Sequence, residues 1–370
     1  MVSNVKHILI AAGGTGGHVY PALAVADYLR AKDIKVTWVG TNRGLESRVI
    51  PAAGIPLEII TISGLRGKGL LNWIFVPVKL FHAIYQAVNI CLRVKPDAIM
   101  GMGGFVSGPC GLAAFILRKP LYVHEQNAIP GLTNRVLSYL ATTVMQAFPG
   151  SFKRKRNIVE TGNPVRQEIT ELVKPEIRMT ERKGNIRLLI IGGSLGAQAL
   201  NENVPQALTE IYSEYRPEIW HQAGKDKLDA TIQNYKNANV EAKVTEFIEN
   251  MATAYEWADL VICRAGALTV SELASAGVAS ILVPYPYAVD DHQTANAKFL
   301  TSANAAILIK QDELAEKLKE TLTELVQSGR KKLIEMAKAA RQLSRPDATR
   351  IVAQICLGIT AGTTSGAKHG

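Results

Sequence analysis

The hydrophobic positions along the chain form one pattern twice: a buried strand, a glycine-rich loop and an amphipathic helix. The first copy predicts a strand over residues 7–12 and a helix over about 21–31. The second predicts a strand over 187–191 and a helix that begins near residue 198. Apolar strands that alternate with helices are typical of a parallel sheet covered by helices. Two copies about half a chain apart therefore predict two Rossmann-like domains.

The boundary between the domains is predicted at residue 163, where a glycine and a proline end a polar turn. We expect one domain over 1–163 and a second over 164–345. The segment 346–370 then holds the end of a terminal helix and a flexible Gly/Thr/Ser-rich tail. Amphipathic patterns over 312–328 and 331–343 predict two helices near the end of the second domain.

The charge of the chain is unevenly distributed. Of the net +10, all the excess lies in residues 1–163, which hold 18 Lys and Arg against 7 Asp and Glu, while the remainder holds 24 against 25. A one-sided basic domain indicates a polyanionic partner, either nucleic acid or an anionic membrane. We find no zinc-ligand spacing or RNP-like aromatic motif. The sequence thus favours a membrane surface and no nucleic acid.

Two segments bear on how such a membrane contact could form. Residues 98–117 carry no charge, but their six glycine and proline residues predict a tight loop instead of a spanning helix. Residues 70–92 place apolar and aromatic side chains at helical spacing in an acid-poor, basic stretch. This second pattern fits either an ordinary buried helix or a helix that lies on a membrane surface.

The two glycine loops predict phosphate binding, because each would bring backbone N–H groups and a helix N-terminus to a ligand. Neither fits the dinucleotide pattern G-x-G-x-x-G, and the chain has no G-x-x-x-x-G-K-[ST] segment. His18 directly follows the first loop. A neutral imidazole there could act as general base on a hydroxyl, or it could simply hydrogen-bond the start of the helix.

Further polar clusters follow other predicted strands in both halves, which predicts a ligand cleft lined from both sides. They include residues 124–127 and 290–297. There is no Asp-x-Asp signature and no His/Asp/Glu cluster with metal-ligand spacing. We therefore expect no metal and no cofactor. A departing diphosphate would be stabilised by backbone amides, a helix dipole and arginine.

Seven motifs of the chain occur in the same order as in the bacterial MurG family, and the resemblance covers roughly residues 7–345. They are Gly13-Gly14-Thr15-Gly16-Gly17-His18, the segment 101–109, His124-Glu125-Gln126-Asn127, Gly162-Asn163-Pro164-Val165-Arg166, the segment 192–197, the segment 266–272 and the segment 290–297. Phe105 stands where tyrosine is expected in many relatives, and Ala265 where serine is expected. The tyrosine's absence puts any hydroxyl role at residue 105 in doubt.

The resemblance implies a GT-B fold, with two Rossmann-like domains whose parallel sheets face each other across a deep cleft. It implies an inverting hexosyltransferase that moves N-acetylglucosamine from UDP-N-acetylglucosamine to an undecaprenyl-diphospho-muramoyl-pentapeptide, completing a peptidoglycan precursor. The expected location is the cytoplasmic face of the bacterial inner membrane, held peripherally, with proteins of cell-wall synthesis as partners. It also implies that the helix near 331–343 packs back across the first domain.

The resemblance also implies roles for individual residues. Ser194 and its loop are similar to the diphosphate site, with Arg166 nearby, and Ile248 is similar to the uracil contact. Gln293 and Asn127 resemble contacts to N-acetylglucosamine, and Glu272 resembles the acceptor for ribose hydroxyls. The remaining substrate contacts that it implies are Thr15, Gly16 and Gly17 on the acceptor side, and Ala267, Leu268, Thr269, Val270 and Ser271 on the donor side.

The general base remains open between two residues. His18 is one candidate, and Glu125 can do the same work or orient the imidazole. The activity also has alternatives: another GT-B enzyme such as a UDP-N-acetylglucosamine 2-epimerase, which needs no second substrate, or a non-catalytic membrane scaffold that binds the UDP-sugar without turnover.

Overall fold

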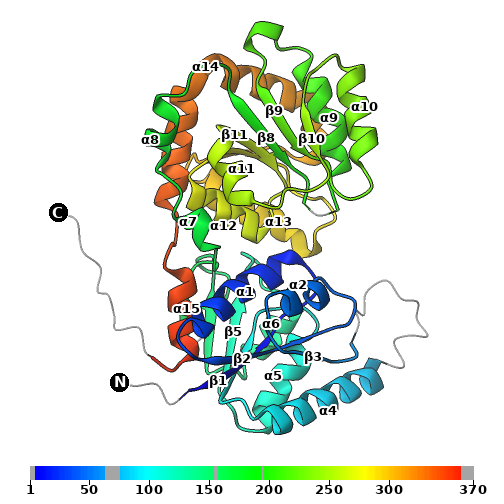
Figure 1. Ribbon diagram of the computed structural model, residues 1–370, viewed down its shortest axis with the longest axis vertical. Coiled ribbons are helices and arrows are strands. Elements are labelled where there is room, and N and C mark those ends of the chain that lie inside the picture. Colours follow the sequence, from blue (N-terminus) through cyan, green and yellow to red (C-terminus); the bar gives the residue numbers. More distant parts are fainter. Residues whose placement is uncertain (1–4, 63–75, 154–156, 194, 360–370) are drawn as a thin grey trace, which may run out of the picture. The chain divides into compact units, whose positions relative to one another are not determined.

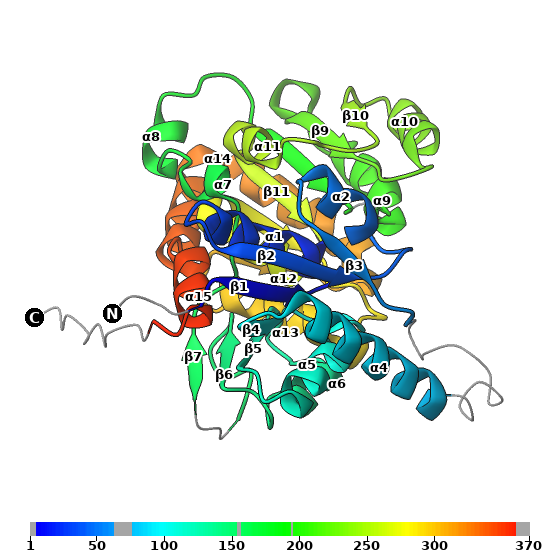
Figure 2. The ribbon, with the colours of Figure 1, turned by 60° about the horizontal axis from the view of Figure 1, so that its bottom comes forward.

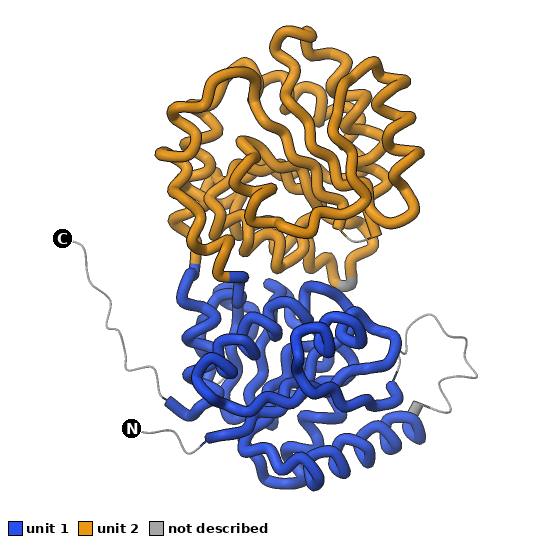
Figure 3. Tube along the Cα trace, in the orientation of Figure 1, with its two compact units in different colours: residues 1–166, 345–370 blue, residues 167–344 orange. Residues whose placement is uncertain are grey.

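The chain divides into two compact units. The computed structural model describes residues 5–62, 76–153, 157–193 and 195–359. One unit comprises residues 1–166 together with 345–370, and the other comprises 167–344 (Figure 3). We predicted boundaries at 163 and 345. In the structure the first unit reaches Arg166 and takes back the chain from Arg345 onward.

The first unit is built on a parallel sheet with the strand order β3-β2-β1-β4-β5-β6-β7 (Figure 1). The strands are β1 (His7–Ala11), β2 (Lys35–Gly40), β3 (Leu57–Ile59), β4 (Ala98–Gly101), β5 (Leu121–Glu125), β6 (Thr143–Gln146) and β7 (Ile158–Glu160). The helices are α1 (Gly16–Arg30), α2 (Glu46–Ala52), α4 (Val76–Val94), α5 (Ser107–Ile116), α6 (Leu132–Leu137) and α15 (Ala348–Cys356). The order of strands reverses at β1, so its carboxyl end is where this fold class binds ligands.

Alternate residues of β1 supply two separate cores. Ile8 and Ile10 pack with α1, α2 and α15 on one face of the sheet. Leu9 and Ala11 pack with α4 and α5 on the other face. All four side chains are fully buried. A strand with both faces covered must be apolar throughout, which explains the continuous apolar run in the sequence.

Helix α15 completes the first core, although it follows the second unit in sequence. Val352, Ala353 and Cys356 are buried against α1 and the sheet, and the Cys356 Sγ lies 3.4 Å from the Sδ of Met100. We expected the helix near 331–343 to pack back on the first domain. Those residues belong to the second unit, as their predicted domain requires, and the helix that the structure assigns to the first unit is α15.

The second unit has a parallel sheet in the order β10-β9-β8-β11-β12-β13. Its strands are β8 (Arg187–Ile191), β9 (Glu218–Gln222), β10 (Lys243–Thr245), β11 (Leu260–Cys263), β12 (Ala279–Leu282) and β13 (Ala306–Leu308). Its helices are α7 (Gln167–Thr170), α8 (Pro175–Thr180), α9 (Gln198–Leu208), α10 (Leu228–Asn237), α11 (Met251–Trp257), α12 (Ala267–Ala276), α13 (His292–Thr301) and α14 (Leu314–Gln342). Strand order reverses at β8, again directly before a glycine loop.

Helix α14 contains a break at Gly329, where φ is 66° and ψ is −173°. The two helical stretches on either side correspond to the two helices predicted from the amphipathic patterns. Leu318 and Leu322 before the break, and Leu333 and Ala337 after it, are fully buried in the core of the second unit. The apolar side chains of residues 331–343 therefore pack in the core of the second unit.

Other predicted elements differ in their bounds. Helix α1 begins at Gly16, earlier than the predicted residue 21, so the glycines of the loop form its first turn. His124 and Glu125 lie in β5 itself, not after it. Residues 98–117 form β4 and α5 with a turn between them. None of the helices in the described part of the chain combines the length and the hydrophobicity needed to span a bilayer.

Candidate active site

The first glycine loop is held by the buried carboxylate of Glu46 at the start of α2. Its Oε2 accepts a hydrogen bond from the Gly14 N–H at 3.0 Å. Its Oε1 accepts from the N–H and the hydroxyl of Thr41, at 3.0 and 2.9 Å. Glu46 is fully buried, so these bonds replace the water it has lost. The sequence did not point to Glu46, because Gly14, the loop residue that it holds, is 32 positions away along the chain.

His18 lies in the first turn of α1 and is half-buried. Its Nδ1 is 3.5 Å from the hydroxyl oxygen of Thr15, the residue that precedes the helix. The other side of the ring packs on Gly103: a Cβ at that position would come within 2.6 Å of the His18 Cδ2. The predicted residues Thr15, Gly16, Gly17 and His18 are thus brought together at the carboxyl end of β1.

The loop that contains Gly103 is fastened directly to the first glycine loop. A Cβ at Gly104 would come within 2.3 Å of the main-chain oxygen of Gly13, so only glycine fits there. The Ser107 hydroxyl is fully buried and accepts from the Gly103 N–H at 3.0 Å. It lies within donating distance of the Ala11 and Gly103 carbonyls, at 2.9 and 2.8 Å.

Glu125 is surrounded by hydrogen-bond donors. Its Oε1 accepts from the N–H and side-chain amide of Asn127, at 2.9 and 3.2 Å. Its Oε2 accepts from the Gly131 N–H at 3.1 Å and from the Asn134 amide at 2.9 Å. The side chain is buried. Two predicted site residues, Glu125 and Asn127, therefore meet, and the carboxylate fixes the loop that presents Asn127.

A chain of hydrogen bonds runs beneath this loop through His124 and Gln126. The His124 Nε2 lies 3.0 Å from the Gly162 carbonyl oxygen, which can only accept, so Nε2 carries the proton. Burial lowers the pKa of His124 to about 4, so the ring is neutral at pH 7. The Gln126 Nε2 donates to the His124 Nδ1 at 3.3 Å and to the Met102 carbonyl at 2.8 Å.

Arg166 is the last residue of the first unit, and its guanidinium lies over the ring of Tyr20, 5.6 Å from the centroid. Tyr20 belongs to α1 and its ring also packs on Gly16. The arginine is thus held beside the first turns of the helix that carries His18. An arginine in this setting keeps its charge and can meet an anionic substrate group.

The second glycine loop depends on close backbone contact. Gly196 has φ of 68°, and a Cβ there would come within 2.0 Å of the Ala223 carbonyl oxygen. Gly224 has φ of 90°, and a Cβ there would meet the Gly196 nitrogen at 2.1 Å. The backbone of the loop therefore packs directly against the backbone that follows β9, and α9 begins directly after the loop in sequence. Ser194, the predicted diphosphate contact, lies outside the described residues.

Polar side chains secure this loop from two sides. The Lys227 ammonium donates to the Leu195 carbonyl at 2.9 Å. Beneath it, the Asn201 side-chain amide donates to the Ala223 carbonyl at 3.0 Å, and its oxygen faces the His221 Nε2 at 3.0 Å. Burial lowers the pKa of His221 to about 3, so this network is neutral. It positions the loop without adding charge.

The predicted donor residues 267–272 form the first turns of α12, directly after β11. The amides at the start of a helix of this length are suited to polar or anionic groups. The Glu272 side chain is buried, and its Oε2 accepts from the Tyr255 hydroxyl at 3.0 Å. Tyr255, on α11, thus fixes one oxygen of Glu272. Nothing in the sequence pattern pointed to this tyrosine.

Gln293 and Ile248 complete the predicted donor set. Gln293 lies in the first turn of α13, and its Oε1 accepts from the Tyr285 N–H at 2.9 Å. The preceding residues Asp290 and Asp291 both have positive φ, 54° and 51°, a conformation that costs energy and is often found at functional sites. Ile248 is buried in the loop after β10, beside the exposed Phe247.

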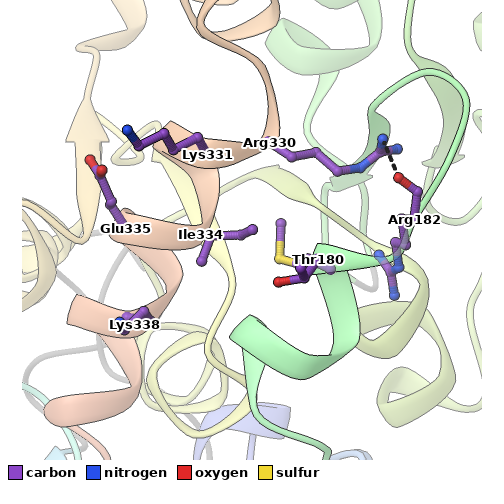
Figure 4. A pocket seen from close by; sticks show the side chains of 8 residues that line it. Thr180, Arg182, Arg330, Lys331, Ile334, Glu335 and Lys338 are labelled. Carbon is purple, nitrogen blue, oxygen red and sulfur yellow. Dashed lines mark hydrogen bonds between the residues drawn. The ribbon is translucent and has the colours of Figure 1, made fainter.

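A separate pocket of about 400 Å³ lies in the second unit between α8 and α14 (Figure 4). Its lining includes Arg182 and Arg330, whose Nη1 donates to the Arg182 carbonyl at 3.1 Å. Both guanidinium groups also pair with the fully buried carboxylate of Asp259, at 2.5 and 3.0 Å. These arginines stabilise the junction of α8 and α14, and the pocket contains none of the predicted site residues.

Among the described residues there is no group of three or more His, Cys, Asp or Glu side chains that could hold a metal ion. The four cysteines are free and buried. Burial raises the pKa of the Cys91 thiol to about 11, which keeps it protonated.

Comparison with known proteins gives the family. Residues 8–146 match the model of the glycosyltransferase family 28 N-terminal domain, and residues 187–352 match that of the C-terminal domain. The UDP-N-acetylglucosamine–N-acetylmuramyl-(pentapeptide) pyrophosphoryl-undecaprenol N-acetylglucosamine transferase of Nitrosospira multiformis is 53% identical, over 96% of this chain and 99% of its own.

Solved structures agree with these matches. The crystal structure of MurG from Acinetobacter baumannii has a TM-score of 0.82 and 42% identity, over 95% of this chain and 99% of that one. A UDP-GlcNAc 2-epimerase from Neisseria meningitidis has a TM-score of 0.66 but 13% identity, over 95% and 100%, and so shares only the fold. The predicted GT-B fold, with its two parallel-sheet units, is confirmed. The chain therefore belongs to glycosyltransferase family 28 and, within it, to the MurG family.

Proposed function

We propose that this protein transfers N-acetylglucosamine from UDP-N-acetylglucosamine to undecaprenyl-diphospho-N-acetylmuramoyl-pentapeptide (lipid I), forming lipid II. The observation that carries this proposal is 53% identity over nearly the whole length to a transferase of that name. A likeness confined to the fold, such as that to the epimerase, carries no such weight. The reaction breaks the bond between the anomeric carbon and the diphosphate and makes a new bond to an acceptor hydroxyl.

The donor half of the site belongs to the second unit in this proposal. The glycine loop after β8 and the first turn of α9 supply amides for the diphosphate. The first turns of α12 contact ribose and sugar, and Glu272 accepts hydrogen bonds from ribose hydroxyls. The Tyr255 hydroxyl donates a hydrogen bond to one Glu272 oxygen. This bond orients the carboxylate for contact with the ribose.

The acceptor half belongs to the first unit, with His18 as general base. Glu125 was the competing candidate. Each of its oxygens already accepts two hydrogen bonds from the protein, so both are engaged in holding the loop and are poorly placed to reach an acceptor hydroxyl. The half-buried His18 imidazole, at the exposed end of the first glycine loop, is the better candidate. Glu125 then acts by holding Asn127 in place.

We further propose that transfer needs no metal ion and no cofactor. The backbone amides of the second glycine loop and an arginine side chain would stabilise the leaving diphosphate in place of Mg²⁺.

The test is transfer of label from UDP-[14C]-N-acetylglucosamine to a short-chain analogue of lipid I, with EDTA present and a reaction without acceptor as control. Labelled lipid supports the donor, the acceptor class and metal independence together. Transfer that requires added Mg²⁺ would overturn only the metal claim. Consumption of the sugar nucleotide without acceptor would instead identify an epimerase or a hydrolase.

Replacing Glu272 with glutamine is expected to weaken UDP binding about tenfold or more, with a smaller effect on kcat, because a ribose contact is made equally in the ground and transition states. Calorimetric titration with UDP measures this. Tyr255→Phe is the matched variant: it keeps the carboxylate but removes its 3.0 Å partner, and we expect an intermediate loss. Unchanged UDP affinity in Glu272→Gln would refute the ribose role.

The first unit also presents an apolar surface that fits peripheral membrane binding. Helices α4, α5 and α6 lie next to one another (Figure 2). Phe81 and Tyr85 on α4, Phe115 on α5 and Leu132 on α6 are all more than half exposed. The described part of the 70–92 segment thus exposes its aromatic residues, and the rest of it, 70–75, lies outside the described residues. With the basic excess of this unit, the surface favours an anionic bilayer.

Replacing Phe81 and Tyr85 together with serine is expected to reduce binding to anionic vesicles several-fold, without lowering the thermal stability of the protein, because both side chains are exposed, at 73% and 58%. Vesicle flotation at low and high salt measures this. Tyr212→Ser, at a 79% exposed tyrosine of the second unit, is the matched control and should bind normally. Equal binding by all three proteins would exclude this surface.

A further inference from the structure

The amide oxygen of Gln126 is one of the buried polar side-chain atoms of the first unit that the described hydrogen bonds leave unsatisfied. Gln126 is 1% exposed, and its Oε1 is buried without a hydrogen-bond partner among the described residues. A buried acceptor that is left unsatisfied destabilises the folded protein, because it has lost its hydrogen bonds to water. Such an atom in a well-packed loop requires a functional or structural reason.

The orientation of this amide is determined by its surroundings. Its nitrogen faces the Met102 carbonyl, which can only accept a hydrogen bond. It also faces the His124 Nδ1, which must accept because the proton of that neutral ring is on Nε2, opposite the Gly162 carbonyl. Rotating the amide by 180° would place an oxygen against two acceptors. The Oε1 therefore stays where it is, and only a donor can satisfy it.

The side chain next to this oxygen is that of His18. A Cβ built on Gly103 would lie 2.9 Å from the His18 Nε2 and 3.4 Å from the Gln126 Oε1. The imidazole nitrogen and the amide oxygen thus border the same small volume, which is open only because residue 103 has no side chain. The opposite nitrogen of His18, Nδ1, is on the exposed side beside the Thr15 hydroxyl.

We propose that Gln126 is a positioning residue for His18: its fixed Oε1 accepts a hydrogen bond from the His18 Nε2–H, which leaves Nδ1 as the basic nitrogen. This inference rests on the proposed role of His18 as general base. The bond forms when the ring turns toward the amide, and bonds of this kind often tighten only when substrate is present. The bond favours one tautomer of the neutral ring and becomes stronger when the ring is protonated.

The other titratable groups around the loop do not take this role. On α2, the Glu46 carboxylate is occupied by Gly14 and Thr41. On β5, Glu125 is occupied by its four donors, and burial keeps His124 neutral with a pKa of about 4. On α1 itself, Tyr20 packs under the Arg166 guanidinium. Among these described groups, the neutral amide oxygen of Gln126 is the acceptor that lies beside Nε2.

The direction of the pH effect follows from the protonated state. His18 must be neutral to accept a proton, so kcat/KM falls as pH drops below its pKa. The Gln126 oxygen stabilises the charged ring and so raises that pKa. The substitution Gln126→Met removes the hydrogen-bond acceptor but keeps a side chain of similar length. We expect it to lower kcat/KM about tenfold near neutral pH and to move the acid limb of the pH profile to lower pH.

The deciding measurement is NMR of the whole protein labelled with 15N- and 13C-histidine and free of substrate. The His18 signal is identified by its loss in His18→Gln. We expect the Nε2–H tautomer in the natural protein, and a loss of that preference with a lower pKa in Gln126→Met. Asn163→Ala is the matched control, because it removes the 3.1 Å bond to the Gln126 main-chain oxygen but keeps the Gln126 side-chain amide, and it should leave the tautomer and pKa unchanged.

If Gln126→Met does not fold, Gln126→Glu provides the second reading: a carboxylate there should raise the His18 pKa. A His18 tautomer and pKa that stay the same in whichever variant folds would overturn the proposal. Because these NMR readings need no substrate, they are independent of the transferase assay. If the NMR change is as expected but no label is transferred to the lipid I analogue, the proposed function is refuted. The His18–Gln126 contact is then still supported.

Discussion

Replacing His18 with alanine is expected to lower kcat about 10²–10⁴-fold, while the affinity for UDP changes little. The base acts only as the acceptor hydroxyl attacks, so its contribution belongs to the transition state. His18 also belongs to the first unit, whereas the glycine loop after β8 and Glu272, which carry the proposed diphosphate and ribose contacts, belong to the second. Steady-state kinetics with lipid I analogue, together with calorimetry of UDP binding, separates the two effects.

Two variants make this result specific to the base. Glu125→Gln keeps the size of the side chain but removes the charge that four donors stabilise. We expect it to lower thermal stability and, through Asn127, to raise KM, without changing the pH profile. If instead Glu125→Gln abolished turnover in a well-folded protein while His18→Ala retained most of it, the assignment of the base would be reversed.

Replacing Gly196 with alanine is expected to have the largest effect on the second unit. The new Cβ would lie 2.0 Å from the Ala223 carbonyl oxygen, and main-chain atoms on both sides leave no flexible group to move aside. The positive φ adds about 1–2 kcal/mol. We expect a loss of more than about 3 kcal/mol in the free energy of unfolding, and a loss of UDP binding because the loop must leave the turn after β9.

Gly193→Ala is the matched control for that substitution. Gly193 has a similar φ of 79°, but no atom lies within 4 Å of a Cβ there. It should therefore show only the cost of the backbone conformation, about 1–2 kcal/mol. Denaturant unfolding of the two variants measures the difference. Equal destabilisation would show that backbone conformation, and not the contact with Ala223, makes glycine necessary at residue 196.

The fold was largely predictable because its signals are local. Apolar strands such as Ile8–Ile10 and Leu188–Ile190 are buried on both faces, so each one is visible as a short run without knowledge of its neighbours. The break in α14 at Gly329 was visible as two amphipathic patterns. The sequence did not show which helix near the end of the chain joins the first unit: we expected 331–343 to pack back on it, and the helix that belongs to it is α15. Amphipathicity shows that a helix packs, but its apolar stripe does not say against which core.

The candidate site was predictable only as a set of motifs. Glycine loops and polar residues at strand ends were visible, and the family resemblance supplied their roles. The residues that hold these loops in place were not visible in the sequence. Glu46, Ser107 and Tyr255 act through partners that are distant in sequence. Gln126 was visible inside a motif. Its significance depends on which way an amide points, which no pattern of residues contains.

The return of the chain to the first unit has a consequence for synthesis on the ribosome. All of the second unit lies between Gln167 and Ser344, so it can fold as soon as that stretch has emerged. The first unit cannot close its core until α15 has been made, because Val352, Ala353 and Cys356 cover the side of α1 that would otherwise face water. The half of the protein that is translated first is therefore the half that is finished last.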